Sequence, residues 1–263
     1  MNLKIGIDLG STLIKVVFVD DGELIWRGLT ATAPGQEALA FRLIEDGRKA
    51  LGLPDGFGAG LAATGYGRNL FQAADLKVDE INAGALGAFR RSGGAARNVL
   101  NIGGQDLKAL SLSEDGRLLD FRMNDKCAAG TGRFFELAAR ILDTPLEDFD
   151  RLSGYAGAEV ELNSTCVVFA ESEIVSLLSR GVKRESIIKA LNVSVARRAA
   201  GLLDRKALSG CLWLDGGPAQ NSGLLAAFED ELLTEVRALP EPLYTVAYGA
   251  AVSLTGFGND AIT

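Results

Sequence analysis

The chain has 263 residues, 48% of them hydrophobic, and a formal net charge of −7 at pH 7. This length and apolar content allow two modest α/β domains, each with a buried core. The 27 Lys and Arg residues are scattered rather than clustered, which argues against nucleic acid or an acidic membrane as a partner. The first residues lack the basic and apolar regions of a signal peptide, and no apolar run approaches membrane-spanning length, so we expect a cytoplasmic protein.

The residue types limit the chemistry further. Histidine is absent, which removes the Ser-His and Cys-His nucleophile arrangements and leaves general base work to carboxylates or positioned water. The three cysteines show no Cys-x-x-Cys spacing, so a structural zinc site is not expected. Three cysteines also make a poor disulfide framework in a reducing compartment.

The first residues predict a strand, a polar glycine turn and a meander. Apolar residues alternate over 3–9, resume over 14–19 and continue over 24–29 after an Asp21-Gly22 hairpin. Glycine lets a turn approach phosphate oxygens, and Mg²⁺ keeps most of its waters while taking few carboxylates. We therefore expect Asp8 to hold a hydrated Mg²⁺, with a plain tight hairpin as the alternative. The expected phosphate-binding residues are Gly10, Ser11, Thr12 and Lys15.

The same order of elements returns later in the chain. A helix is predicted over 36–51 and a short strand over 58–63, and then strands are predicted over 98–102, 107–112 and 117–122. A supersecondary unit repeated at domain-scale spacing favours two related domains that face each other, with ligands between them. We expect the first domain over 1–95 plus 239–263 and the second over 96–238.

Helical periodicity predicts that the second domain is richer in helix. A buried strand is expected over 211–214, a helix over 221–233, and a final apolar run over 248–254 that packs against the first domain. The periodic apolar residues are Phe134, Leu137, Ala138 and Ile141, then Ile174, Val175 and Leu178, then Ile187, Ile188, Leu191 and Val195.

Two more glycine turns strengthen the prediction of a phosphate-binding protein. Gly103-Gly104-Gln105-Asp106 supplies a second loop, with a glutamine able to orient water. Asp215-Gly216-Gly217 supplies a third, suited to close approach by a nucleoside. Three such turns resemble those of the actin, Hsp70 and sugar-kinase class of ATPases, and ATP binding is expected. No Walker-type Gly-x-x-x-x-Gly-Lys-Ser/Thr run occurs.

Cys127 and Cys166 each precede a predicted helix, where unpaired backbone amides and the helix dipole favour a thiolate. They are either ligands of an iron–sulfur cluster or buried apolar residues, the usual state of free cysteine. The small residues that follow Cys127 favour a cluster, because they let backbone amides crowd an anion. A [4Fe–4S] cluster takes four thiolates, which a symmetric homodimer would supply. Cys211, inside an apolar run, is expected in the core.

Six stretches resemble the motifs of the ATP-dependent activators of 2-hydroxyacyl-CoA dehydratases and the related ATPase subunits of benzoyl-CoA reductase, the BadF/BadG/BcrA/BcrD type. The resemblance implies a two-domain actin-like fold of the acetate and sugar kinase, Hsp70 and actin superfamily, with its ribonuclease H-like motif. It also implies a homodimer bridged by one oxygen-sensitive [4Fe–4S] cluster on Cys127 and Cys166. The stretches are residues 6–12, 63–69, 102–106, 123–134, 164–173 and 216–221.

The resemblance further implies a function. Such proteins take a low-potential electron from ferredoxin or flavodoxin and, on ATP hydrolysis, pass it to a client iron–sulfur dehydratase or reductase. The implied cofactors are ATP or ADP, Mg²⁺ and one cluster per dimer. Asp8, Gln105 and Asp106 would be catalytic. The implied nucleotide-binding residues are Gly10, Ser11, Thr12, Lys15, Gly103, Gly104, Gln105, Gly216, Gly217 and Gln220.

The chain departs from the family pattern at three places. Asn101 stands where the family usually carries Asp, which removes a carboxylate near the expected metal and could slow hydrolysis. Residues 80–83 lack the usual Cys-His or Ala-His pair, and no Gln is evident around 242–244. Two other functions remain open: a small-molecule kinase of the sugar-kinase type, which leaves both cysteine motifs unexplained, and an actin-like nucleotide-binding scaffold.

Overall fold

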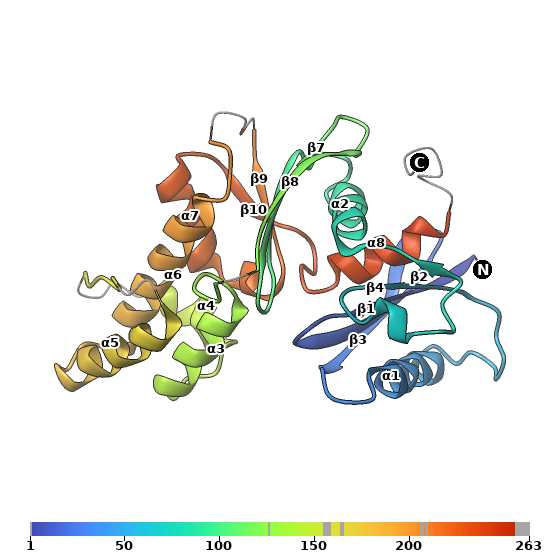
Figure 1. Cartoon of the computed structure of the whole chain (residues 1–263), viewed down its shortest axis with the longest axis horizontal. Helices are drawn as coiled ribbons and strands as arrows, with labels where there is room; N and C mark the ends of the chain where they lie inside the picture. Colours follow the sequence, from blue (N-terminus) through green and yellow to red (C-terminus); the bar gives the residue numbers. More distant parts are fainter. Residues whose placement is uncertain are drawn as a thin grey trace. The chain divides into compact units, whose positions relative to one another are not determined.

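The structure is a computed structural model that describes residues 2–125, 127–154, 159–163, 166–205, 208 and 210–255. The chain divides into two compact units, each built on one five-stranded sheet (Figure 1). Unit 1 comprises Met1–Ala95, Leu112–Leu119 and Leu243–Thr263. Unit 2 comprises Ala96–Ser111 and Asp120–Pro242. No helix in the described ranges combines the length and the apolar character needed to cross a membrane.

The sheet of unit 1 has the order β3-β2-β1-β4-β5. Its central strand, β1 (Leu3–Leu9), is buried throughout. It runs antiparallel to β2 (Leu13–Asp20) and parallel to β4 (Gly60–Thr64). The outer strands are β3 (Glu23–Ala31) and β5 (Leu76–Lys77).

Helices bury both faces of this sheet because its strands carry apolar residues on both sides. The alternate residues Leu3, Ile5, Ile7 and Leu9 belong to one hydrophobic cluster with Ala40 and Leu43 of α1 (Gln36–Ala50). The opposite face, on which Val17 and Val19 of β2 lie, packs against α8 (Thr245–Ser253), which contacts α2 (Glu80–Arg91) in turn. The final apolar run thus forms α8 and packs on unit 1, as its composition predicts.

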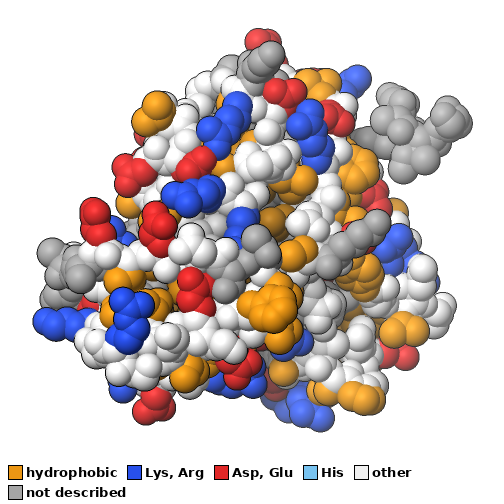
Figure 2. Space-filling model, turned by 60° about the vertical axis from the view of Figure 1, so that its left-hand side comes forward, with side chains coloured by type: hydrophobic (Ala, Val, Ile, Leu, Met, Phe, Trp, Pro, Cys, Tyr) orange, Lys and Arg blue, Asp and Glu red, His pale blue; other side chains and the backbone are white. Residues whose placement is uncertain are grey.

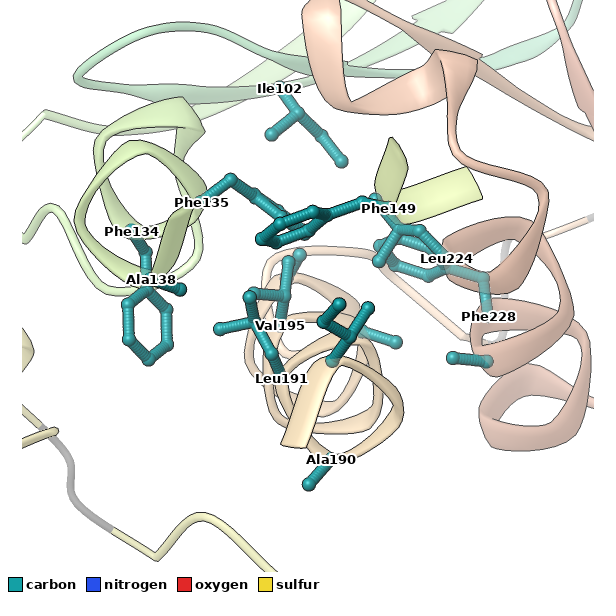
Figure 3. Packing of buried hydrophobic residues seen from close by; sticks show 14 of the residues in the cluster. Ile102, Phe134, Phe135, Ala138, Phe149, Ala190, Leu191, Val195, Leu224 and Phe228 are labelled. Atoms are coloured by element: carbon teal, nitrogen blue, oxygen red, sulfur yellow. The ribbon is translucent and has the colours of Figure 1, made fainter. Parts of the chain in front are cut away.

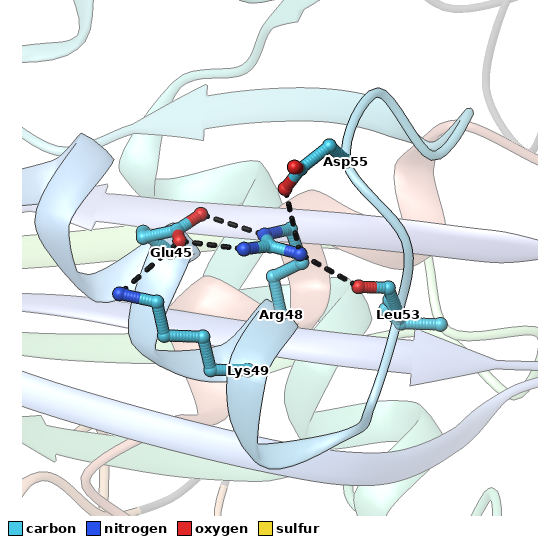
Figure 4. A network of polar contacts seen from close by, with 5 residues as sticks. All are labelled: Glu45, Arg48, Lys49, Leu53 and Asp55. Atoms are coloured by element: carbon cyan, nitrogen blue, oxygen red, sulfur yellow. Dashed lines mark hydrogen bonds and ion pairs between the residues drawn. The ribbon is translucent and has the colours of Figure 1, made fainter.

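The last turn of α1 is tied to the loop that follows it (Figure 4). Arg48 forms a bidentate pair with Glu45, at 2.7 Å for each nitrogen, and donates a further hydrogen bond to the carbonyl of Leu53 at 2.7 Å. Asp55 lies 2.9 Å from the same guanidinium, and Lys49 lies 3.3 Å from Glu45. The hydrogen bonds from Arg48 lower the pKa of Glu45 to about 2.

The sheet of unit 2 has the order β10-β9-β6-β7-β8. Here β6 (Asn98–Ile102) is central, antiparallel to β7 (Leu107–Leu112) and parallel to β9 (Leu212–Asp215). The outer strands are β8 (Leu118–Asn124) and β10 (Val236–Ala238). The strand order is the same in both units. From one edge of each sheet to the other, the third, second, first, fourth and fifth strands of that unit along the chain lie side by side. The predicted repeat of strand-turn-strand units is therefore confirmed.

The helices of unit 2 enclose one hydrophobic core (Figure 3). Phe134 and Phe135 come from α3, Phe149 from α4, and Leu191 and Val195 from α6. Because α6 is packed on nearly all sides, its apolar residues do not form a single stripe. The helices are α3 (Gly132–Ile141), α4 (Asp148–Ser153), α5 (Val167–Ser179), α6 (Arg184–Ala200), the short 3₁₀ helix η2 (Gly217–Gln220) and α7 (Ser222–Leu232).

Some details differ from the sequence prediction. The short elements α4, β5 and β10 were not predicted. α2 also has no counterpart among the predicted helices, although Asp79 caps it by accepting a hydrogen bond from the backbone N–H of Asn82. Cys211 lies just before β9 and is only partly buried, so its expected place in the core is wrong. This partial burial raises the pKa of the Cys211 thiol.

Candidate functional site

The turn between β1 and β2 begins at an ion pair between a buried aspartate and a partly buried lysine. Asp8 is 3% exposed, and its Oδ2 lies 2.8 Å from Nζ of Lys15, its partner in the β1–β2 register. Beyond this pair, the backbone N–H of Gly10 donates to the carbonyl of Leu13, and Thr32 donates its hydroxyl to the carbonyl of Gly10. Ser11 is exposed at the tip. The turn is thus held in place at its base and open to solvent at its tip.

Four buried polar atoms around this turn have no hydrogen-bond partner among the described residues. They are Oδ1 of Asp8, Oγ1 of Thr12, Oε1 of Gln36 and Oγ1 of Thr64. Buried polar side-chain atoms are nearly always paired, with protein or with bound solvent or ligand. A cluster of unpaired oxygens beside one turn therefore marks a place suited to water molecules or a hydrated cation, which donate to oxygens.

A second turn of unit 1 packs directly on Asp8. A Cβ built on Gly65, whose φ is +83°, would lie 2.6 Å from Oδ1 of Asp8 and 2.7 Å from the carbonyl of Leu9. Only glycine fits such an approach. The backbone N–H of Gly67 donates to the same Leu9 carbonyl at 3.0 Å. The turn that follows β4 is therefore part of the wall around the Asp8 carboxylate.

The corresponding turn of unit 2 rests on a buried ion pair. Oδ1 of Asp106 lies 2.7 Å from Nζ of Lys108, and the two side chains are 8% and 5% exposed. The backbone N–H of Gly103 donates to the carbonyl of Asp106 at 2.9 Å, which closes the turn. Gln105 is exposed at the tip, next to Gly104. Its amide can therefore reach a group that comes from solvent.

A third turn lies beside it at the end of β9. Asn101 donates its side-chain N–H to Oδ2 of Asp215 at 2.6 Å, and both residues are buried. The backbone at Gly216, where φ is +92°, passes so close to the end of β6 that a Cβ built on Gly216 would lie 2.2 Å from the carbonyl oxygen of Ile102. Gly217 and Gln220 belong to η2, and Gln220 is exposed. The second and third expected turns are thus brought together within unit 2.

The register reveals a matching row of three residues in each sheet. In unit 1 it is Lys15 on β2, Asp8 on β1 and Thr64 on β4. In unit 2 it is Lys108 on β7, Asn101 on β6 and Asp215 on β9. Both rows carry a cation at one end, but the carboxylate is central in unit 1 and terminal in unit 2. Thr64 and Lys108 were not predicted as site residues, because only the strand pairing aligns them with Asp8 and Asn101.

The glycine turn of unit 2 is hydrogen-bonded to the start of α3. The backbone N–H of Gly132 donates to the carbonyl of Gly103 at 2.8 Å, and that of Arg133 donates to the carbonyl of Gly104 at 2.9 Å. The N–H of Phe134 donates to the carbonyl of Thr131. The expectation that the first amides of this helix are unpaired is therefore wrong, since the turn accepts them.

Cys127 and Cys166 are exposed free thiols in unit 2. Cys166 is the N-cap residue of α5, and Cys127 lies four positions before Thr131, the N-cap residue of α3. The two predicted helix starts are thus confirmed. Within the described ranges no three His, Cys, Asp or Glu side chains gather as a metal-binding group.

Exposed apolar side chains follow Cys166 on α5. Val168 is 70% exposed, Phe169 is 68% exposed and Val175 is 51% exposed. On the face drawn in Figure 2, hydrophobic side chains lie among Lys, Arg, Asp and Glu side chains of mixed sign. An apolar surface next to an exposed thiol is suited to contact with another protein.

Comparison with known proteins places these features in a family. The model of the BadF/BadG/BcrA/BcrD ATPase family matches residues 5–253. The activator of lactoyl-CoA dehydratase from Anaerotignum propionicum is 41% identical, over 94% of this chain and 95% of that protein. The structure of the activator of 2-hydroxyisocaproyl-CoA dehydratase from Clostridium difficile with bound ADPNP superposes with a TM-score of 0.89 and 36% identity, covering 95% and 93% of the two chains.

A more distant match concerns the fold alone. A ROK family glucokinase from Streptomyces griseus has a TM-score of 0.58 at 17% identity, covering 95% of this chain and 98% of that one. Together with the two sheets of equal strand order, these structures confirm the two-domain actin-like ATPase fold.

Proposed function

The chain belongs to the BadF/BadG/BcrA/BcrD ATPase family, and from this membership we propose that it is a cytoplasmic, homodimeric ATPase that activates a client iron–sulfur enzyme. The client would be a 2-hydroxyacyl-CoA dehydratase, or a benzoyl-CoA reductase as the second possibility. The activator receives an electron from ferredoxin or flavodoxin and passes it on when ATP is hydrolysed. The name of the 41% identical relative, an activator of lactoyl-CoA dehydratase, supports the first client class.

The proposed nucleotide site uses the glycine turns of both sheets. Asp8 would hold a hydrated Mg²⁺ through Oδ1, because its other oxygen is paired with Lys15. Gln105 would orient the attacking water, and Asp106, fixed by Lys108, would hold the turn that carries it. The phosphates would contact Gly10, Ser11, Thr12, Lys15, Gly103 and Gly104, and the nucleoside would contact Gly216, Gly217 and Gln220.

The proposed cluster ligands are Cys127 and Cys166. Both thiols are exposed and free, so they can meet the two thiols of a second subunit at a twofold axis. A [4Fe–4S] cluster bound there would supply a one-electron carrier. The exposed Val168 and Phe169 would be covered by the same contact, which would remove apolar surface from water.

One observation carries the proposal. The first two residues of α3, the helix that follows the segment carrying Cys127, donate hydrogen bonds to Gly103 and Gly104 of the turn that we propose binds the phosphates. A change at the nucleotide turn would therefore shift the start of α3. Neither a sugar kinase nor a scaffold gives a reason for two exposed cysteines before two helices of one unit.

The test is an anaerobic preparation with matched cysteine variants. We expect the wild type to contain about two iron atoms per chain, to be a dimer, and to activate a 2-hydroxyacyl-CoA dehydratase in the presence of ATP and a reductant. Cys127→Ser should lose iron and activation but keep binding ADPNP. Cys211→Ser is the control and should keep both iron and activation, because Cys211 is not one of the two exposed thiols.

Other results would contradict the proposal. Iron that persists in Cys127→Ser at the wild-type level would remove this residue from the ligand set. An iron-free wild type that phosphorylates a sugar would favour the kinase alternative.

A further inference from the structure

Thr64 is a buried polar residue with no assigned role. It ends β4, its side chain is fully buried, and its hydroxyl has no hydrogen-bond partner in the described structure. A lone buried hydroxyl is costly, because it loses its hydrogen bonds to water and gains none. Such a residue needs either a structural partner or a ligand.

The strand register aligns Thr64 with Asp8. The two residues are partners on the adjacent parallel strands β4 and β1, so their side chains lie on the same face of the sheet, one strand spacing of ~4.8 Å apart. Lys15 lies on the other side of Asp8 in the same row and pairs with its Oδ2. The remaining oxygen, Oδ1, is the one near which the backbone of Gly65 passes, directly after Thr64.

Two oxygens without partners thus lie side by side on this face. They do not bond to each other, since both Oδ1 of Asp8 and Oγ1 of Thr64 are unpaired. A carboxylate oxygen only accepts hydrogen bonds, and a hydroxyl can accept as well as donate. A water molecule bound to a metal ion donates both of its hydrogens, which suits two neighbouring acceptors. Mg²⁺ keeps several of its waters in protein sites.

We propose that Thr64 is a positioning residue for the metal: its hydroxyl and Oδ1 of Asp8 together hold the water shell of the Mg²⁺ that accompanies the nucleotide. This inference rests on the proposed nucleotide site. It gives the end of β4 a function in that site, next to the turn of residues 65–67, which packs on Leu9 through Gly67.

The corresponding position of unit 2 has a different chemistry. Asp215 occupies the place of Thr64 in the row, and its Oδ2 accepts a hydrogen bond from Asn101. The equivalent strands β4 and β9 thus both end in a polar residue. Only Thr64 adds a neutral hydroxyl beside a carboxylate, that of Asp8, which is already paired with a lysine. We therefore assign the metal shell to the row of unit 1.

The test compares Thr64→Val, which keeps the shape and removes the hydroxyl, with Thr64→Ser, which keeps the hydroxyl. The readouts are Mn²⁺ binding in the presence of ADP, followed by electron paramagnetic resonance, and ADP binding without metal, followed by calorimetry. We expect Thr64→Val to weaken Mn²⁺ binding by about tenfold, in the range found for residues that orient metal ligands. We expect Thr64→Ser to bind Mn²⁺ as the wild type does, and ADP affinity without metal to be equal in all three proteins.

Thermal unfolding of the metal-free proteins separates this role from a structural one. Removing an unpaired buried hydroxyl removes a desolvation cost, so Thr64→Val should melt no lower than the wild type without ligands. Unchanged Mn²⁺ affinity in Thr64→Val would overturn the inference, whatever its melting temperature. If Thr64→Val does not fold, Thr64→Ala replaces it, and equal Mn²⁺ binding by Thr64→Ala and Thr64→Ser would overturn the inference.

The same experiment separates this inference from the proposed function. If the wild type binds ADP and Mn²⁺ and Thr64→Val binds both equally well, the role of Thr64 is overturned while the proposed function is not. A wild type that binds neither ADP nor Mn²⁺ would overturn both.

Discussion

Asn101 and Asp8 occupy equivalent places on the central strands of the two sheets, but only Asp8 carries a charge. Asn101 uses its amide to bond the carboxylate of Asp215. A neutral donor satisfies a buried carboxylate without adding a second charge, which a buried aspartate at this position would do. The departure of Asn101 from the family pattern thus comes with a specific partner for its side chain.

Asn101→Asp is expected to destabilise the protein in a pH-dependent way. Burial and the nearby Asp215 would raise the pKa of the introduced carboxyl by more than Lys108, which is already paired with Asp106, would lower it. The folded state would therefore take up a proton that the unfolded state releases. The stability relative to wild type would be least affected at acidic pH and would fall as the pH rises, to a loss of about 2 kcal/mol or more at pH 7. Urea unfolding at pH 5 and pH 7 measures this difference.

The control for this change is Asn69→Asp, which introduces the same charge at an exposed position. Its stability should stay within about 0.5 kcal/mol of wild type at both pH values. A pH-independent loss in Asn101→Asp would mean that the lost hydrogen bond, and not the added charge, causes the effect.

The ion pair between Arg48 and Glu45 on α1 should make the stability of the protein depend on pH (Figure 4). Because Arg48 lowers the pKa of Glu45 from 4.5 to about 2, the pair stabilises the folded state fully above pH 4.5 and loses this contribution as the pH falls toward 2. Arg48→Met should therefore lower the melting temperature at pH 7 and by less at pH 3. Arg42→Met, an exposed change on the same helix, should show no such convergence with wild type.

At the scale of elements, α2 and α8 lie in unusually close contact. A Cβ built on Gly249 of α8 would lie 1.8 Å from the carbonyl of Ala83 in α2. Both helices are rich in small residues where they meet, which lets their backbones approach. This contact explains why α2 was not predicted: its buried face consists of alanine and glycine and lacks the large apolar side chains that mark the helices of unit 2 in the sequence.

Gly249→Ala is expected to disrupt this packing. The added methyl group has no space, so α8 must move away from α2, with a loss of about 3 kcal/mol in the free energy of unfolding. Gly58→Ala is the matched control, because a Cβ at Gly58 meets nothing within 4 Å; its stability should be unchanged or slightly higher. Guanidinium unfolding compares the two. Equal midpoints would show that the α2–α8 contact has room to relax.

At the scale of the whole molecule, local patterns sufficed to predict the glycine turns and the strands other than the short outer strands β5 and β10. The alternation around Ile5 and Ile7, and the turns at Gly10 and Gly103, are short-range signals that two sheets of equal strand order bear out. Partners distant in sequence could not be predicted in this way. Asn101 and Asp215 are 114 positions apart, and their pairing depends on which strands become neighbours and in what register.

The candidate site follows the same division. Residue type and local spacing suffice to propose Asp8, Lys15, Gln105 and the two cysteines as site residues. Thr64 lies within the matching stretch 63–69, but the sequence alone indicates no role for it, because its unpaired hydroxyl becomes visible only when β4 lies beside β1.

The hydrogen bonds at the start of α3 attach this helix to the glycine turn of unit 2, so these backbone N–H groups are not available to bind an anion. An amide N–H makes one strong hydrogen bond, and those of Gly132 and Arg133 are already engaged by Gly103 and Gly104. Under the proposed function the two cysteines would therefore differ. The helix that follows Cys127 is hydrogen-bonded to the turn proposed to bind the nucleotide, so a movement of that turn would reach Cys127 directly.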